Sequence, residues 1–292
     1  MRDSQIKYRI FSDEMECADA CANRICKKMQ EAQKDKQAFS LGLATGSTPI
    51  PIYKFLTKYS VKNKLDWSNI HTFNLDEYVG ISAEDPQSFS FFMFSQLFDR
   101  LLWSPKRPYG LPLENIHLLN GLAKKLEDLD ILEIKYLGKY WNKLGEGRGL
   151  SKEQEELILD LRCQKYEQLL HKYGPVDIQL LGIGSNGHIA FVEPGSAPSS
   201  KTSIVSLSDE TRQANARFFQ ESSLEVPERA LSMGIATILK AKEIALVATG
   251  ESKADAVARA LNGPITDLLP ASHLQKHQNI VFYLDKAAAS LI

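Results

Sequence analysis

The sequence contains no run of about 18 apolar residues, the length that a membrane-spanning helix needs. It begins Met-Arg-Asp-Ser-Gln, which is too polar for a secretory signal peptide, so we expect a cytoplasmic protein that does not enter a membrane. Neither sign of charge is in excess, since 35 Lys and Arg residues face 36 Asp and Glu residues. No net field attracts nucleic acid, and the expected partner is a small molecule.

Cysteine is also scarce, with four residues in the chain. Cys17, Cys21 and Cys26 fall in one predicted helix, and no further ligands stand near them to complete a metal site. We therefore interpret the thiols as structural and expect neither a metal site nor a disulfide framework.

Short apolar runs alternate with longer helical patterns along the chain, which is typical of parallel strands joined by crossover helices. The predicted strands are Phe39–Leu43, His71–Leu75, Ile116–Asn120, Val176–Ile183, Ile244–Ala248 and Ile280–Leu284. The predicted helices are 13–33, 49–59, 88–103, 152–173, 229–241 and 252–262. The pattern predicts an α/β fold, with a doubly wound, mostly parallel, Rossmann-like sheet and helices on both faces.

We expect a single domain over residues 1–292, because no Pro/Gly-rich linker, repeat or low-complexity tract divides the chain. The exception to its regular alternation is a highly charged segment at about 124–156, which we interpret as a helical insertion. Ser151 and Gln154 have the spacing of a capping box and mark the start of the helix that follows. The insertion is either a solvated elaboration or a contact between subunits.

A first candidate site follows the strand at Phe39–Leu43, where Thr45-Gly46-Ser47-Thr48-Pro49 opens a helix. Glycine allows close approach of the backbone, and the start of the helix offers free N–H groups and a positive dipole end. Gly46, Ser47 and Thr48 are therefore candidates to bind an anion, although an ordinary capped turn has the same pattern.

A second candidate is Asp76-Glu77, just past the end of another predicted strand. Two adjacent carboxylates at the edge of a sheet can divide their tasks, one moving a proton on carbon and the other making structural hydrogen bonds. A solvated acidic pair in a loop is the alternative.

The third and most specific candidate runs from a buried strand into a glycine-rich loop, from Leu181 to Ser196. Asn186, Gly187, His188 and Glu193 supply an amide, an imidazole and a carboxylate within eight residues. These are the materials of a histidine acid/base whose tautomer is fixed by its neighbours.

Two cations complete the set of candidates. Arg217 lies in an Ala-Arg-Phe-Phe run, and Lys253 follows a predicted strand and a glycine at the start of a helix. Lys253 would therefore lie at the same edge of the sheet as the Thr45 turn, where either cation could bind an anion.

These residues resemble the glucosamine-6-phosphate deaminase family over almost the whole chain, the segment at 124–156 excepted. The resemblance is carried by Thr-Gly-Ser-Thr-Pro at 45–49, Asp-Glu-Tyr-Val-Gly at 76–80, Gly-His-Ile-Ala-Phe at 187–191, Glu-Pro-Gly-Ser at 193–196, Arg-Phe-Phe at 217–219 and Ser-x-Leu-Gln-x-His at 272–277. It implies isomerisation and deamination of glucosamine 6-phosphate, an amino-sugar phosphate, to fructose 6-phosphate and ammonia. It also implies that no metal or organic cofactor is needed.

The resemblance also implies roles for individual residues. Asp76 would carry a proton between C2 and C1, and His188 would open the pyranose ring. Glu193 would orient His188, while Arg217 and Lys253 would hold the phosphate together with the Gly46–Thr48 turn. Glu77 and Gly187 would complete the substrate site, and a homo-oligomer is possible.

The sequence departs from the family pattern at Asn186, where Asp is common, and the absence of that charge leaves Glu193 as the only nearby anion in sequence. Phe89 replaces a common Tyr and Val192 a common Asn, so preference for the galacto epimer stays open. Ser203 and Val205 replace basic residues of allosterically regulated members, and we expect no activation by N-acetylglucosamine 6-phosphate. The alternative functions are a hydrolase resembling 6-phosphogluconolactonase, and a non-catalytic sugar-phosphate sensor.

Overall fold

The structure is a computed structural model that describes residues 6–138, 149–219 and 222–292. Its centre is a seven-stranded sheet in which every neighbouring pair is parallel. The strands follow the order β1 (Lys7–Phe11), β10 (Ile280–Asp285), β9 (Ile244–Ala248), β6 (Ile178–Leu181), β2 (Phe39–Leu43), β3 (Ile70–Asn74) and β5 (Ile116–His117). This confirms the predicted doubly wound α/β fold, with the reversal of strand order between β2 and β6.

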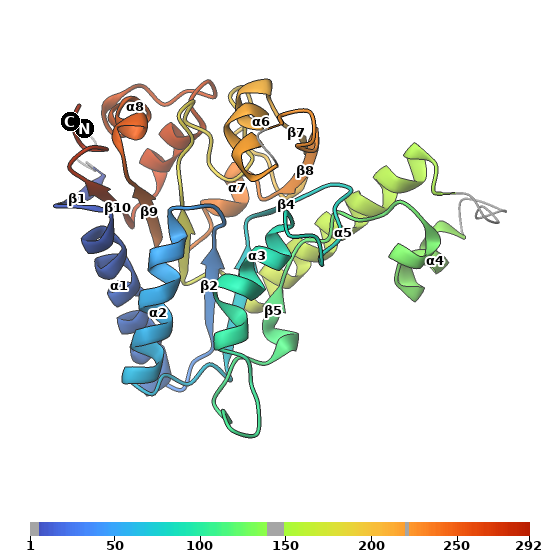
Figure 1. The fold of residues 1–292 in the computed structure, drawn as a ribbon, viewed down its shortest axis with the longest axis horizontal. Coiled ribbons are helices and arrows are strands. Elements are labelled where there is room, and N and C mark those ends of the chain that lie inside the picture. The colour runs from blue at the N-terminus through green and yellow to red at the C-terminus, as the bar shows by residue number, and fades with distance from the viewer. Residues whose placement is uncertain (1–5, 139–148, 220–221) are drawn as a thin grey trace.

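Helices cover both faces of this sheet (Figure 1). α1 (Glu14–Lys34) and α2 (Pro49–Lys62) pack together on one face, and α5 (Lys152–Tyr173) lies across the other. β2 and β9 are buried along their whole length, which explains why neither strand carries a charged residue. All four cysteines are buried and form no disulfide, as the structural interpretation predicted.

A second, three-stranded sheet was not predicted. β4 (Asp76–Tyr78) pairs with β8 (Arg229–Ser232), and β8 pairs with β7 (Ser203–Ser206), both antiparallel. The predicted helix at 229–241 is therefore wrong at its start. Only α7 (Ile235–Ile238) is helical there, because Arg229–Ser232 satisfies its backbone by pairing with two strands distant in sequence.

The small sheet and α6 (Asp209–Asn215) enclose their own cluster of apolar side chains. The buried members of this cluster are Tyr78, Phe191, Leu207, Phe219, Val226 and Ala230. Because Tyr78 directly follows Glu77 and Phe191 comes three residues after His188, this cluster fixes two of the segments that carry the site.

Other boundaries also differ from the prediction. The helix expected at 88–103 is α3 (Phe89–Gln96), which is shorter because Leu97 leaves the helical conformation. The chain then turns back, and the backbone N–H of Leu111 donates a hydrogen bond to the Leu101 carbonyl. β1 was missed because it is an exposed, largely polar edge strand. α8 (Ala254–Asn262) lies within its predicted range. No helix of the described ranges is both long and apolar enough to cross a membrane.

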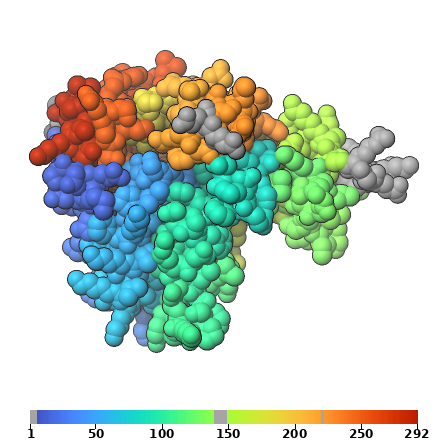
Figure 2. All heavy atoms as spheres, viewed as in Figure 1, coloured from blue at the N-terminus to red at the C-terminus, as the bar shows by residue number. Residues whose placement is uncertain are grey.

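The charged segment at about 124–156 lies partly outside the described residues, since 139–148 are not described. Its described part contains α4 (Ile131–Leu137) and the start of α5, where Ser151 and Gln154 form the predicted capping box. α4 projects from one end of the molecule (Figures 1 and 2). Arg162 of α5 holds it there through a buried bidentate ion pair with Glu133, at 2.9 Å for both contacts.

Candidate active site

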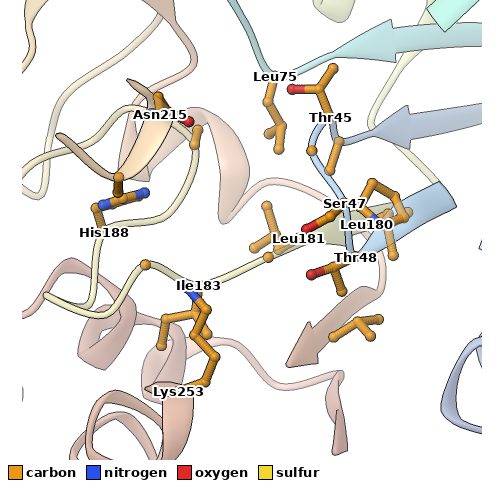
Figure 3. A pocket seen from close by; sticks show the side chains of 18 of the residues that line it. Thr45, Ser47, Thr48, Leu75, Leu180, Leu181, Ile183, His188, Asn215 and Lys253 are labelled. Carbon is orange, nitrogen blue, oxygen red and sulfur yellow. The ribbon is translucent and has the colours of Figure 1, made fainter. Parts of the chain in front are cut away.

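A cavity of about 570 Å³ opens at the carboxyl ends of the central strands, beside the point where strand order reverses. Its wall includes the turn after β2, the start of β4, the loop after β6, the end of α6 and the turn after β9. Ligands of doubly wound sheets bind at this place in the fold. Figure 3 shows Thr45, Ser47 and Thr48 on one side of the pocket, with His188 and Asn215 on the other.

The turn after β2 has the features of an anion seat. Gly46 has a φ of +102°, which an L side chain rarely adopts, and Thr48 makes no side-chain cap to α2. Among the described residues, no hydrogen bond is made by the backbone N–H groups of Gly46, Ser47 or Thr48. These donors and the start of α2 therefore face the cavity without a partner, as the sequence predicted.

Both candidate cations line the same cavity. Burial lowers the pKa of Lys253, and the nearby charge of Arg217 lowers it further. Within the described ranges neither cation forms an ion pair with a carboxylate, although the Arg217 guanidinium lies 4.7 Å from the Phe218 ring centroid. Two neighbouring cations without a counter-ion favour a bound anion.

The two carboxylates of the acidic pair have different surroundings. Glu77 accepts four hydrogen bonds of 2.9–3.0 Å, from Ser88 Oγ and from the backbone N–H groups of Tyr78, Phe89 and Ser90. It therefore anchors the start of α3, and it does not line the cavity.

Asp76 does line the cavity, and its carboxylate makes no hydrogen bond within the described part of the chain. Burial, reinforced by the charge of Glu77, raises the pKa of Asp76 to about 8. The backbone around Asp76 is fixed on both sides, because Leu75 bonds to Leu43 and β4 pairs with β8. Asp76 is thus a positioned carboxylate with the basicity needed to remove a proton from carbon.

The loop after β6 places His188 in the cavity, and a hydrogen bond with Asn186 of the same loop orients its ring. Asn186 Oδ1 lies 2.8 Å from His188 Nδ1, and Asn186 Nδ2 donates to Glu193 Oε2 at 3.2 Å. Because a carboxylate can only accept, this orientation of the amide leaves Oδ1 to accept from Nδ1–H. Nε2 is then the unprotonated nitrogen of the neutral ring. Burial lowers the pKa of His188 while Glu193 opposes this shift, and the net direction is downward.

Glu193 also connects this loop to α6. Its Oε1 accepts from both the N–H and the hydroxyl of Ser208, each at 3.1 Å, and Ser208 caps α6. α6 leads directly into Arg217, so one short segment joins the support of His188 to a candidate anion ligand.

Two glycines make the histidine loop possible. A Cβ on Gly184 would lie 2.3 Å from Cε1 and Nδ1 of His188, so the imidazole occupies the space that a side chain would fill. Gly187 has a φ of +85° and packs against Leu269. The sequence identified this loop as glycine-rich but gave no reason for either position.

The structure brings together the predicted residues Gly46, Ser47, Thr48, Asp76, His188, Arg217 and Lys253 around one cavity. The others, Glu77, Asn186, Gly187 and Glu193, stand behind them and support them. Residues that the sequence analysis did not single out also line the cavity, namely Thr45, Asn215, Thr249 and Ser252. The feature of the sequence that could have identified them is their position, just past a strand or at the end of a helix.

Phe89 and Val192, two residues that depart from the family pattern, lie in different places relative to the cavity. Phe89 lines the cavity, stacks with Phe191 and packs at a tilt against Tyr78, whereas Val192 is buried away from the cavity wall. The described residues contain no group of three or more His, Cys, Asp or Glu side chains that could hold a metal ion.

Comparison with known proteins identifies one family. The family model described as glucosamine-6-phosphate isomerases/6-phosphogluconolactonase matches residues 12–282. Glucosamine-6-phosphate deaminase 2 of Giardia intestinalis is 42% identical over 266 residues, covering 91% of this chain and 86% of that protein. Glucosamine-6-phosphate deaminase of Thermoanaerobacter sp. (strain X514) is 39% identical over 259 residues, covering 89% and 86%.

Solved structures extend the likeness to the fold. A monomeric glucosamine-6-phosphate deaminase superposes with a TM-score of 0.79 at 36% identity, covering 98% of this chain and 100% of that one. 6-Phosphogluconolactonase from Leishmania guyanensis has a TM-score of 0.67 at 20% identity, covering 97% of each chain, and this shows a shared fold alone.

Proposed function

Because this chain belongs to the glucosamine-6-phosphate isomerase/6-phosphogluconolactonase family, we propose that it converts glucosamine 6-phosphate and water to fructose 6-phosphate and ammonia. The observation that carries the proposal is the cavity itself, where an anion seat, a buried carboxylate and a supported histidine meet at one edge of the sheet. The reaction needs each of them, because it begins with a closed sugar ring carrying a phosphate and ends with the carbonyl moved from C1 to C2 and the amino group lost.

The phosphate binds at the end of the cavity formed by the turn after β2. Gly46, Ser47 and Thr48 donate backbone hydrogen bonds, and Arg217 and Lys253 supply positive charge. The phosphate thereby holds the sugar by a group that does not react, which positions C1 and C2 for the catalytic side chains.

His188 opens the ring. In its neutral form Nε2 accepts the proton of the C1 hydroxyl and passes a proton to the ring oxygen, so that the bond from C1 to the ring oxygen breaks and an aldehyde forms. The lowered pKa of His188 keeps the imidazole neutral at the start. While His188 carries the transferred proton, Asn186 stabilises the positively charged imidazole by accepting from Nδ1–H. Asn186 in turn donates to the Glu193 carboxylate, which supplies a nearby negative charge.

Asp76 then acts on carbon. The aldehyde makes the C2 proton acidic, and the Asp76 carboxylate removes it and delivers it to C1. One proton also passes from the amino group to O1, so that the aldehyde becomes a hydroxyl group and an imine is left at C2. Water adds to this C2=N group, the C2=O bond forms, and the C–N bond breaks to release ammonia. One water is consumed for each ammonia released, and the carboxylate is regenerated.

A lactonase is the rival that the shared fold allows. It is disfavoured by two sequence features, Tyr78-Val79-Gly80 after the acidic pair and the Glu-Pro-Gly-Ser run that begins at Glu193. The low identity to the lactonase structures adds no support for that activity.

Purified protein incubated separately with glucosamine 6-phosphate and with 6-phosphogluconolactone distinguishes these functions. We expect ammonia and fructose 6-phosphate in equal amounts from the first and no accelerated hydrolysis of the second. Hydrolysis of the lactone without release of ammonia would replace the proposal, and binding of the amino sugar without turnover would favour the sensor.

Two further expectations accompany the proposed function. A homo-oligomer is possible, and the mass of the protein in solution by light scattering decides it. The absence of basic side chains at Ser203 and Val205 leads us to expect no activation by N-acetylglucosamine 6-phosphate. A marked fall in the half-saturating substrate concentration on its addition would contradict this.

A further inference from the structure

A second cavity, of about 400 Å³, lies between α5 and α7 on the face of the sheet that α5 covers. Its wall is formed by the C-terminal half of α5, the turn that leads into β6, β6 itself and α7. None of its lining residues lines the candidate active site. Its volume is within the range of small-molecule sites in proteins, so size alone permits a ligand.

One polar side chain, Gln179 of β6, lines this cavity from the buried sheet. Gln179 is 1% exposed, and its Nε2 donates to the Leu180 carbonyl at 3.0 Å. Its Oε1 lies directly over Gly42, where a Cβ would be only 2.1 Å away, and accepts no hydrogen bond from the described residues. An acceptor of a residue that lines a cavity and receives no hydrogen bond from the protein favours a ligand that brings a donor.

The wall of the cavity carries two opposite charges. Glu167 Oε1 is saturated by Thr202 N–H, Thr202 Oγ1 and Thr237 Oγ1 at 3.1, 2.7 and 2.5 Å. Its Oε2 has only Lys240 Nζ, at 3.9 Å. Burial opposes ionisation of Glu167, but the hydrogen bonds from Thr237 and Thr202 prevail and lower its pKa, so a carboxylate and an ammonium group stand side by side.

The rest of the lining is mainly apolar. Leu170, Pro175, Val176, Met233 and Ala241 complete most of the wall, and His171 lies at the exposed rim. A ligand that fits this lining has an apolar body, a donor for Gln179 and charges that complement Glu167 and Lys240.

We propose that this cavity binds an amino acid with an apolar side chain, as its zwitterion. The ammonium group contacts Glu167 Oε2 and Gln179 Oε1, and the carboxylate contacts Lys240. Glu167 Oε2 and Lys240 Nζ lie 3.9 Å apart, so the two neighbouring charges of one α-amino acid can each meet an opposite charge on the wall. The apolar side chain replaces water against Leu170 and Met233. This binding does not depend on the proposed catalytic function.

Calorimetric titration of the full chain with L-leucine tests the proposal, with inorganic phosphate present to occupy the active site. L-leucinamide lacks the carboxylate and 4-methylpentanoate lacks the ammonium group, so each removes one predicted contact. We expect both to bind roughly tenfold or more weakly than leucine, the effect of losing one charge-assisted hydrogen bond.

Variants then assign the contacts. In Lys240→Met the preference for leucine over leucinamide falls to about twofold or less. The matched control Lys242→Met changes an exposed lysine outside the cavity and keeps the preference. Gln179→Met reduces the preference for leucine over 4-methylpentanoate. Absence of leucine binding by the wild type, or a preference for leucine over leucinamide that Lys240→Met leaves intact, overturns the proposal.

Discussion

Replacing Asp76 by Asn tests the physical state of the candidate base. Burial and the charge of Glu77 raise the pKa of Asp76 from 3.8 to about 8. The folded protein therefore holds the proton more tightly than the unfolded chain does. The stability that this group contributes is fully present below about pH 4 and is lost as the pH rises to about 8.

The size of the effect follows from the shift. Each pH unit between the two pKa values removes about 1.4 kcal/mol from the free energy of unfolding of the wild type. Asn has no proton to lose, so Asp76→Asn escapes this penalty. Relative to the wild type, the variant should gain about 4 kcal/mol between about pH 5 and about pH 8.

Urea denaturation followed by circular dichroism, on wild type and variant at several pH values, measures this difference. Asp255→Asn is the matched control, because it makes the same chemical change at an exposed position of α8 outside the site and so reports any general effect of replacing Asp by Asn. A difference for Asp76→Asn that stays flat from pH 5 to pH 8 would refute the claim that this carboxylate is ionised only at a cost to stability.

Three further substitutions test the supports of the site and of the fold. Gly184→Ala places a methyl group against the His188 ring and should lower the rate of ammonia release about 100-fold or more without lowering the melting temperature; near wild-type activity would show that the loop can adjust. Asn186→Asp should raise the pKa of His188 and move the acid limb of the pH–rate profile upward by about one unit; an unchanged profile would show that this position does not tune the ring. Arg162→Met leaves the buried Glu133 with only the more distant Lys165, at 3.7 Å, and should cost up to about 3–5 kcal/mol in chemical denaturation, so an unchanged midpoint would remove the Arg162–Glu133 ion pair from the account of how α4 is held.

Patterns of adjacent residues predicted the main strands and helices of the fold. They failed for strands that form by pairing with segments distant in sequence. The buried apolar runs of β2 and β9 and the capping box of Ser151 are contained in a few adjacent residues, and the structure confirms each of them. β4, β7 and β8 are short and become strands only by pairing: β8 pairs with β7, about 25 residues before it, and with β4, about 150 residues before it. Arg229–Ser232 therefore looked like the start of a helix.

The same distinction separates the parts of the site. The turn at Gly46 and the loop at His188 follow strands directly, so their place at the edge of the sheet could be predicted. The support of Glu193 by Ser208 and the space that Gly184 leaves for the imidazole arise from contacts that no local pattern encodes. Which carboxylate of the acidic pair is free could also be decided only once the start of α3 was found to bond to Glu77.

Ammonia and fructose 6-phosphate release from glucosamine 6-phosphate, compared for wild type, Asp76→Asn and His188→Gln, tests the central claim most directly. We predict that the wild type releases both products in equal amounts and that each variant loses about 100-fold or more of the rate while remaining folded. Release by folded Asp76→Asn at a rate near that of the wild type would contradict the assignment of the base and, with it, the proposed chemistry of the cavity.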